Sequence, residues 1–144
     1  MTNNLILTIF FISMQFVNLY AENLNITSKN VLIDKKTETT IFENDVIIKD
    51  KKNNIIKSNY AEYNKKSNLI TLKNNVIAED AQGNIFEADK ALYNENLRIF
   101  ESIGKTVITT NSGSVVNTAD IIFNHNQNIV FSKKKNNNYR FPKK

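Results

Sequence analysis

The sequence predicts an all-β protein, a single antiparallel meander of about eight strands built from repeats of about 30 residues. Three observations predict this fold. Of the 144 residues, 38 are Ile, Val or Thr, and these β-branched side chains favour strands. Similar apolar segments recur at a constant interval, and turns rich in Asn and Gly separate them. Beyond the N-terminal segment, no stretch has the 3.6-residue period that marks a helix.

The repeat is visible in two pairs of segments. Residues 46–50 (VIIKD) resemble residues 76–80 (VIAED), and residues 54–58 (NIIKS) resemble residues 84–88 (NIFEA). An Asp or Asn also follows an apolar residue once in each repeat, at Asp34, Asn64, Asn94 and Asn124. This periodicity is typical of stacked supersecondary units, none of which can bury its own apolar face.

The strands and their bends follow from this pattern. The apolar phase slips between Ile56 and Ala61, which predicts a β-bulge or a bend. Asn74, Asn75 and Gly104 stand where long strands would kink, and Asn and Gly between strands predict tight turns. The expected strands are residues 24–34, 39–50, 54–64, 68–80, 84–94, 97–110, 114–124 and 128–132.

The N-terminus is predicted to be a targeting segment. Leu5 to Met14 form an apolar run of ten residues, and no charged residue precedes Glu22. The run is too short for a bilayer core, which takes about 20 residues, but it suits a secretory signal cleaved after Ala21. An uncleaved membrane anchor and a buried strand are the alternatives. The predicted organisation is a signal peptide at 1–21, a β-domain at 22–132 and a basic, disordered tail at 133–144.

The charge distribution argues against a nucleic-acid-binding surface. Six of the 19 cationic residues lie in the tail at 133–144, which has no acid. The remaining 13 cations nearly balance the 14 acids. A nucleic-acid-binding domain usually has a basic face on its folded body, so we expect a solvated tail and no nucleic-acid partner.

The composition also argues against an enzyme. There is no Cys, which excludes disulfides, thiolate zinc sites and cysteine nucleophiles. The single His125 is expected to be an exposed turn residue, and Glu79 and Asp80 are expected to be solvated strand ends rather than a calcium site. We therefore expect no catalytic residue, no metal and no cofactor.

Two segments resemble a known repeat. Residues 73–80 (KNNVIAED) and 83–94 (GNIFEADKALYN) are similar to the OstA-like repeat of the lipopolysaccharide transport proteins, and the resemblance spans about residues 24–132. That LptA-type family includes periplasmic LptA, the periplasmic part of LptC and the N-terminal domain of LptD. The resemblance implies a β-jelly-roll, or folded "taco", that is open along one side and shields the acyl chains of lipopolysaccharide in the periplasm.

An inward apolar face of the meander would form the lipid-binding groove. A closed hydrophobic core without a ligand is the alternative reading of the same residues. The residues expected on this face are Val46, Ile48, Ile56, Tyr63, Leu69, Val76, Phe86, Tyr93, Leu97, Ile99, Val107, Val116, Phe123, Ile129 and Phe131.

The two ends of the meander predict partners. An open sheet leaves unpaired edges near residues 23–34 and 128–132, and such edges can dock further strands. The expected partners are lipopolysaccharide, homologous LptC-like and LptD-like β-domains of a bridge between the two membranes, and further copies of the chain joined head to tail. Two alternatives stay open: a truncated N-terminal domain of LptD, and a structural β-repeat protein that binds no lipid.

Overall fold

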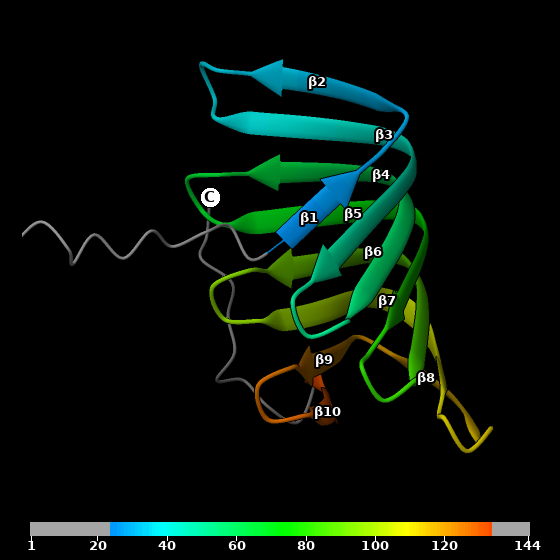
Figure 1. Cartoon of the computed structure of the whole chain (residues 1–144). Coiled ribbons are helices and arrows are strands. Elements are labelled where there is room, and N and C mark those ends of the chain that lie inside the picture. The colour runs from blue at the N-terminus through cyan, green and yellow to red at the C-terminus, as the bar shows by residue number, and fades with distance from the viewer. Residues whose placement is uncertain (1–23, 134–144) are drawn as a thin grey trace, which may run out of the picture.

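The computed structural model describes residues 24–133, which form one antiparallel sheet of ten strands (Figure 1). Six of the eight expected strands are confirmed to within two residues at each end. The expected strands at 24–34 and 114–124 are each divided in two. The strands are β1 (Leu24–Thr27), β2 (Asn30–Asp34), β3 (Thr39–Asp50), β4 (Ile55–Asn64), β5 (Leu69–Glu79), β6 (Ile85–Asn94), β7 (Ile99–Thr109), β8 (Val115–Ala119), β9 (Ile121–Asn124) and β10 (Ile129–Ser132).

Both divisions arise because the long neighbouring strand bends. β1 and β2 pair with different halves of β3, and β8 and β9 pair with different halves of β7. The second break is held by Asp120, whose Oδ1 accepts a hydrogen bond of 2.8 Å from the backbone N–H of Gly104. Gly104 has φ +83°, a conformation that costs an L side chain energy, so a glycine suits the bend.

The bends of the long strands are β-bulges that line up across the sheet. Register shifts occur between Glu43 and Val46, and the predicted slip between Ile56 and Ala61 is confirmed as a shift between Lys57 and Tyr60. Asn74 and Asn75, with φ of 65° and 55°, form the predicted kink in β5. Asn tolerates this left-handed region better than most residues do, so the bulges are encoded locally.

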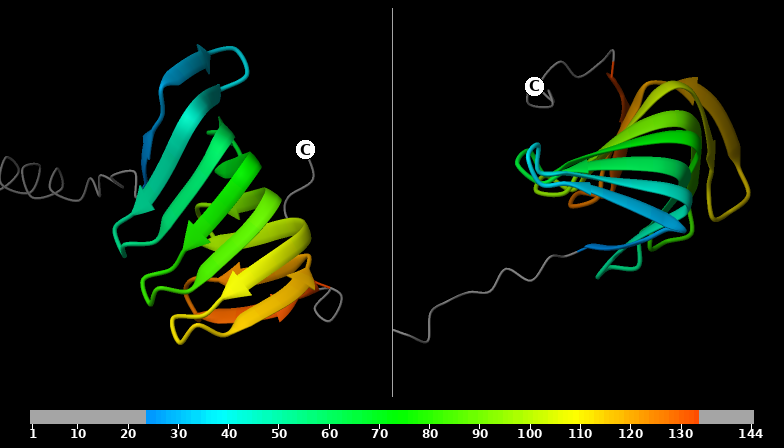
Figure 2. Two further views of the ribbon diagram at one scale, coloured as in Figure 1. Left: turned by 90° about the vertical axis from the view of Figure 1, so that its right-hand side faces the viewer. Right: turned by 90° about the horizontal axis from the view of Figure 1, so that it is seen from above.

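The line of bulges divides the sheet into two walls, which diverge from the bend when viewed from above (Figure 2, right). We name each wall after its first strand. The β1 wall contains β1, residues 46–50, 55–58, 76–79, 85–88 and 105–109, and β8. The β2 wall contains β2, residues 39–43, 60–64, 69–73, 90–94 and 99–103, β9 and β10.

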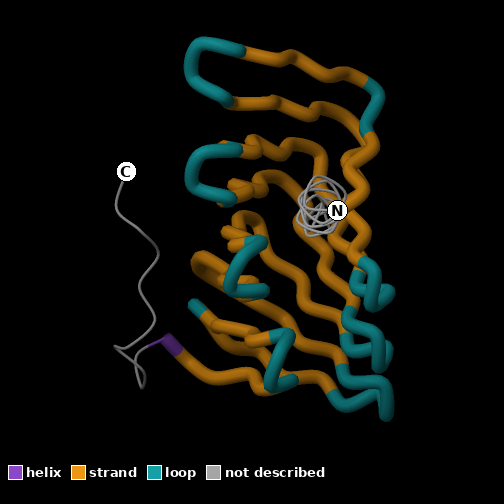
Figure 3. Tube along the Cα trace, turned by 60° about the vertical axis from the view of Figure 1, so that its left-hand side comes forward, coloured by secondary structure: helices purple, strands orange, loops and turns teal. Residues whose placement is uncertain are grey.

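The hairpin turns lie in two rows along the free margins of the walls (Figure 3). Each turn of the β2 wall is capped by the Asp or Asn at the end of the preceding strand. Asn94 Oδ1, for example, accepts a hydrogen bond of 2.9 Å from the backbone N–H of Leu97. The turns of the β1 wall are linked to one another, because Asn54 Oδ1 accepts from Ala81 N and Asn84 Oδ1 accepts from Asn111 N, both at 3.1 Å. The sequence repeat therefore reflects a ladder of turns.

The core lies between the two walls. Phe86 of the β1 wall stacks on Phe123 of the β2 wall with ring centroids 4.9 Å apart, and it also lies 6.4 Å from Phe100. All three rings are at most 3% exposed. The interior around them is filled by side chains, and packed aromatic pairs of this kind contribute about 0.5–1.5 kcal/mol beyond their burial.

The predicted signal peptide at 1–21 and the predicted tail, apart from Lys133, lie outside the described residues. Over residues 24–133, the structure contains no helix with the length and hydropathy of a membrane span.

Candidate functional site: an apolar groove between two walls

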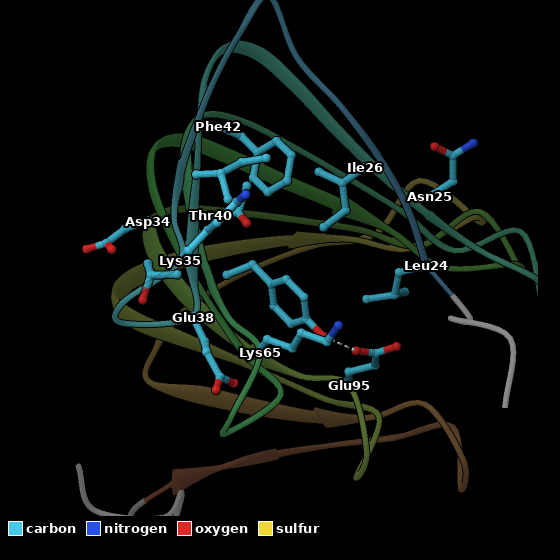
Figure 4. Close-up of a pocket in the computed structure, with 13 residues that line it drawn as sticks. Leu24, Asn25, Ile26, Asp34, Lys35, Glu38, Thr40, Phe42, Lys65 and Glu95 are labelled. Carbon is cyan, nitrogen blue, oxygen red and sulfur yellow. Dashed lines mark hydrogen bonds between the residues drawn. The ribbon is translucent and has the colours of Figure 1, made fainter.

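A large cavity opens between the walls at the N-terminal end of the sheet (Figure 4). Its volume is about 820 Å³. The β1 wall contributes Leu24 and Ile26, and the β2 wall contributes Phe42 and Tyr63. Phe42 and Ile26 face the same space, whereas Asn25 points away from it (Figure 4). The cavity exists because only the short β1 faces the broad hairpin of β2 and β3. At this end of the sheet, side chains therefore do not fill the space between the two walls.

The mouth of the cavity is charged. Lys35 and Lys65 supply two cations, and Asp34, Glu38 and Glu95 supply three acids. Glu95 Oε2 accepts a hydrogen bond of 3.0 Å from the hydroxyl of Tyr63, and this bond joins two successive repeats (Figure 4). The site thus combines an apolar interior with a polar rim, as binding sites for amphipathic ligands commonly do.

Further along the sheet the space between the walls is nearly closed. The next cavity inward has a volume of about 10 Å³, and Leu24 lines both cavities. Asp50 and Ile56 of the β1 wall and Tyr93 and His125 from the β2 side line the small cavity. The groove is therefore open at its N-terminal end and packed from this point onward.

An ion pair joins the two walls at this point. Arg98 Nη2, in a turn of the β2 wall, lies 2.6 Å from Asp50 Oδ2 at the end of β3. The Asp50 side chain is 4% exposed and also accepts hydrogen bonds from the Lys52 and Asn54 backbone N–H groups and from Asn54 Nδ2. Burial raises the pKa of Asp50, but the hydrogen bonds from Asn54 and Lys52 and the charge of Arg98 outweigh it, and the net pKa lies below its ordinary value.

His125 lies in a turn, as predicted, but it is half-buried beside this ion pair, so the prediction that it is exposed is wrong. Its ring lies 4.3 Å from the centroid of Phe123 and 5.7 Å from that of Tyr93. Burial lowers the pKa of His125 to about 4 and raises the pKa of Tyr93 to about 12. Neither ring nitrogen of His125 has a hydrogen-bond partner among residues 24–133. The ring packs inward against these two aromatic side chains. The sequence of the turn alone does not predict this contact.

The prediction that Asp80 is a solvated strand end is also wrong. It is 5% exposed, and its carboxylate accepts hydrogen bonds from the backbone N–H groups of Gln82 and Asn84 and from Asn84 Nδ2. Its role is to cap a turn, as Asp50 does one repeat earlier.

Nine of the fifteen predicted groove residues lie on the inner face of the walls. Eight of them are buried or packed against the core, whereas Val116 is 48% exposed on the edge strand β8, where it pairs with Ile108. The inner nine are Val46, Ile48, Ile56, Tyr63, Val76, Phe86, Tyr93, Val116 and Phe123.

The other six predicted groove residues do not face the space between the walls, although Leu69 and Ile99 are buried. Leu97 lies in a turn and is 48% exposed. Leu69, Ile99, Val107, Ile129 and Phe131 lie in register rows of the outer face. The prediction placed them inward because both faces of these strands are apolar, as in Leu69–Ile70 and Ile99–Phe100. The alternation of apolar and polar residues, which normally identifies the buried face, is missing there.

The structure adds inner-face residues that the prediction missed. Ile70, Leu72 and Phe100 are fully buried on the inner face, and Ile70 and Phe100 are the direct neighbours of the predicted groove residues Leu69 and Ile99. Ile26 and Phe42, which line the open cavity, were also missed. The signal that could have found Ile70 and Phe100 is their spacing from Tyr63 and Tyr93, since the inner row runs Tyr63, Ile70, Tyr93, Phe100 and Phe123.

Comparisons with known proteins agree with this architecture. The chain is similar to LptH from Pseudomonas aeruginosa, described as the LptA homologous periplasmic component of the conserved lipopolysaccharide transport device. The TM-score is 0.67 at 11% sequence identity, and the match covers 78% of this chain and 85% of that one. This likeness shows the same fold. A comparison with curated proteins finds no significant match.

The sequence itself matches a family. The model of the family described as "Lipopolysaccharide-assembly, LptC-related" matches residues 21–134, which include the whole described sheet and both of its walls. The predicted resemblance to lipopolysaccharide transport proteins is therefore confirmed, and the chain belongs to the LptC-related lipopolysaccharide-assembly family.

Proposed function

We propose that this protein carries lipopolysaccharide through the periplasm, and that it holds the acyl chains in the cavity at the N-terminal end of the folded sheet. The observation that carries the proposal is the cavity of about 820 Å³, open at one end and lined by Leu24, Ile26, Phe42 and Tyr63. It occurs in a member of a lipopolysaccharide-assembly family.

The chemistry of the cavity suits an acyl chain with an anionic headgroup. Burial of each CH₂ group contributes about 0.8 kcal/mol, so even part of one acyl chain gains several kcal/mol from the apolar lining. Lys35 and Lys65 at the mouth can pair with the phosphates of the headgroup, beside the three acids Asp34, Glu38 and Glu95 of the same rim. Transport of this kind makes or breaks no covalent bond, and the proposed role is that of a non-enzymatic carrier without a cofactor.

Both ends of the sheet support a place in a bridge between membranes. At one end β2 exposes three consecutive apolar residues, Val31, Leu32 and Ile33, each at least 55% accessible. At the other end β8 and β10 form the edges, and Val115 and Ile129 are 60% and 51% exposed. Exposed apolar edge strands are templates for β-augmentation. We propose that they join LptC-like or LptD-like β-domains, or further copies of this chain.

Site-specific photo-crosslinking tests the lipid site. A benzoylphenylalanine residue at position 42 should crosslink purified lipopolysaccharide, whereas the same residue at position 77, on the outer face, should not. Ile77 is the matched control because it is apolar, 39% exposed and lies in mid-sheet.

A pair of substitutions completes the test. Phe42→Asp should lower lipopolysaccharide binding at least tenfold, since it places a charge in the apolar cavity, and Ile77→Asp should leave it unchanged. Equal crosslinking from positions 42 and 77, or equal binding by the two folded variants, would contradict the proposed site.

A further inference from the structure

Arg98 breaks the repeat at a conformationally demanding position. It has φ 55°, in the left-handed region, and so have its counterparts in the other three turns of the β2 wall, Glu38 (54°), Asn68 (51°) and Asn128 (55°). Asn adopts this conformation more readily than Arg does. A residue that violates a local preference is expected to have a reason in the tertiary structure. Here the reason is the ion pair, because Arg98 reaches Asp50 on the opposite wall.

The ion pair stands where the open groove ends. On the N-terminal side the cavity measures about 820 Å³, and on the other side, where Asp50, Tyr93 and His125 form the lining, it measures about 10 Å³. The same pairing does not recur one repeat later, since Asn128 occupies the position of Arg98 relative to Asp80. The two walls are thus linked by an Arg–Asp pair at one place only within residues 24–133.

We infer that Arg98 and Asp50 form a clasp that determines how far an acyl chain reaches into the groove, with Arg98 as the specificity-determining residue. With the clasp closed, the chain occupies the N-terminal cavity. With the clasp open, the margins of the walls separate, and the chain extends past His125 toward Phe86 and Phe123. This inference rests on the proposed function.

The clasp also explains why polar groups line the small cavity. Asp50 and Tyr93 bring a charge and a hydroxyl into the lining, next to a His125 ring whose nitrogens are unpaired among the described residues. A purely structural core would favour apolar side chains here, because unpaired buried polar atoms are costly. A boundary that must open to water and lipid tolerates polar groups.

Crosslinking at two depths tests the clasp, with purified lipopolysaccharide as the probe. One reporter is benzoylphenylalanine at position 42, in the open cavity, and the other is at position 123, beyond the clasp. Arg98→Asn introduces the residue that two of the other three turns have at this position, so the turn is retained while the clasp is lost. We expect crosslinking at position 123 to rise at least threefold and crosslinking at position 42 to stay unchanged.

Two variants keep the test independent of folding. Asp50→Asn retains an oxygen acceptor for the turn and removes the charge, and it should reproduce the effect of Arg98→Asn. In the opposite direction, the double variant Asp50→Cys and Arg98→Cys, joined by a bismaleimide in this otherwise cysteine-free chain, should reduce crosslinking at position 123 to background. Lys29→Asn, which breaks the exposed Lys29–Asp45 pair, is the matched control and should change neither signal.

The outcomes separate the clasp from the proposed function. If position 42 crosslinks normally and Arg98→Asn and Asp50→Asn leave position 123 at the wild-type level, the clasp is refuted and lipid binding stands. If position 42 fails to crosslink in every variant, the proposed function fails and the clasp with it. Circular dichroism confirms that each variant compared is folded.

Discussion

Arg98 Nη2 and Asp50 Oδ2 lie 2.6 Å apart although the two residues are separated by 48 positions in the sequence. Their contact joins the free margins of the two walls, which are otherwise connected through the bend of the sheet and through the core between them. On one side of this contact the interior is an open cavity, and on the other side it is a packed core. One molecule therefore combines a binding groove with a stabilising core, and the two regions respond differently to substitution.

Phe86→Ala should destabilise the protein far more than Phe42→Ala. Phe86 is 1% exposed and packs against Phe100 and Phe123, so its truncation leaves a cavity and should cost about 3–5 kcal/mol. Phe42 borders space that is already open, and its truncation should cost about 1–2 kcal/mol. Urea unfolding followed by circular dichroism measures both values. Equal losses would show that the N-terminal cavity is packed in solution.

His125 should make the protein less stable in mild acid. Its pKa is about 4 in the folded protein against an ordinary value of 6.5, so between these two values the unfolded chain binds a proton that the folded protein does not. The stabilisation is fully present above pH 6.5 and is lost as the pH falls toward 4, with a slope of at most about 1.4 kcal/mol per pH unit. Unfolding free energies measured across this range give the slope.

The control for this pH dependence is His125→Phe. Phe keeps the contacts with Tyr93 and Phe123 and removes the two buried nitrogens, so the variant should be about 1–2 kcal/mol more stable at neutral pH. It should also show a flatter profile between pH 4 and 6.5. An unchanged slope would assign the acid sensitivity to the carboxylates instead.

Asn84→Ala should weaken the ladder of turns along the β1 wall. Asn84 donates a hydrogen bond of 2.7 Å from Nδ2 to Asp80 Oδ2 and accepts one of 3.1 Å from Asn111 N. The loss of both should cost about 1–2 kcal/mol, since the carboxylate of Asp80 is largely buried. Asn96, exposed in a turn of the β2 wall, is the control, and Asn96→Ala should change stability by less than about 0.5 kcal/mol. Thermal and urea denaturation compare the two variants.

Charges at the terminal edges should block assembly without unfolding the protein. Leu32→Lys on β2 and Ile129→Lys on β10 place a cation on edges where the native residues are 64% and 51% exposed, and charged edge strands resist pairing. We expect the mass of the wild-type protein in light scattering to increase with concentration, and we expect either substitution to abolish that increase. Ile77→Lys, in mid-sheet, should leave it intact. A wild-type chain that stays monomeric at all concentrations and pairs with no LptC-like or LptD-like domain would contradict the bridge.

Much of the fold was predictable because its determinants are local. An Asp or Asn in each repeat caps a turn, Asn74, Asn75 and Gly104 adopt positive φ at the bends, and each of these preferences belongs to a residue and its immediate neighbours. The strand ranges, the antiparallel meander and the bulge after Ile56 follow from the same signals.

The sequence by itself therefore determined the strands, the turns, the bends and the family of this protein. Only the tertiary structure decided which face of each strand lines the space between the walls, because Leu69 and Ile70, or Ile99 and Phe100, are equally apolar neighbours and all four are buried. It also decided that β1 leaves a cavity beside Phe42 and that Arg98 meets Asp50. These features depend on the distance between two walls that are far apart in the chain, and no pattern of neighbouring residues encodes that distance.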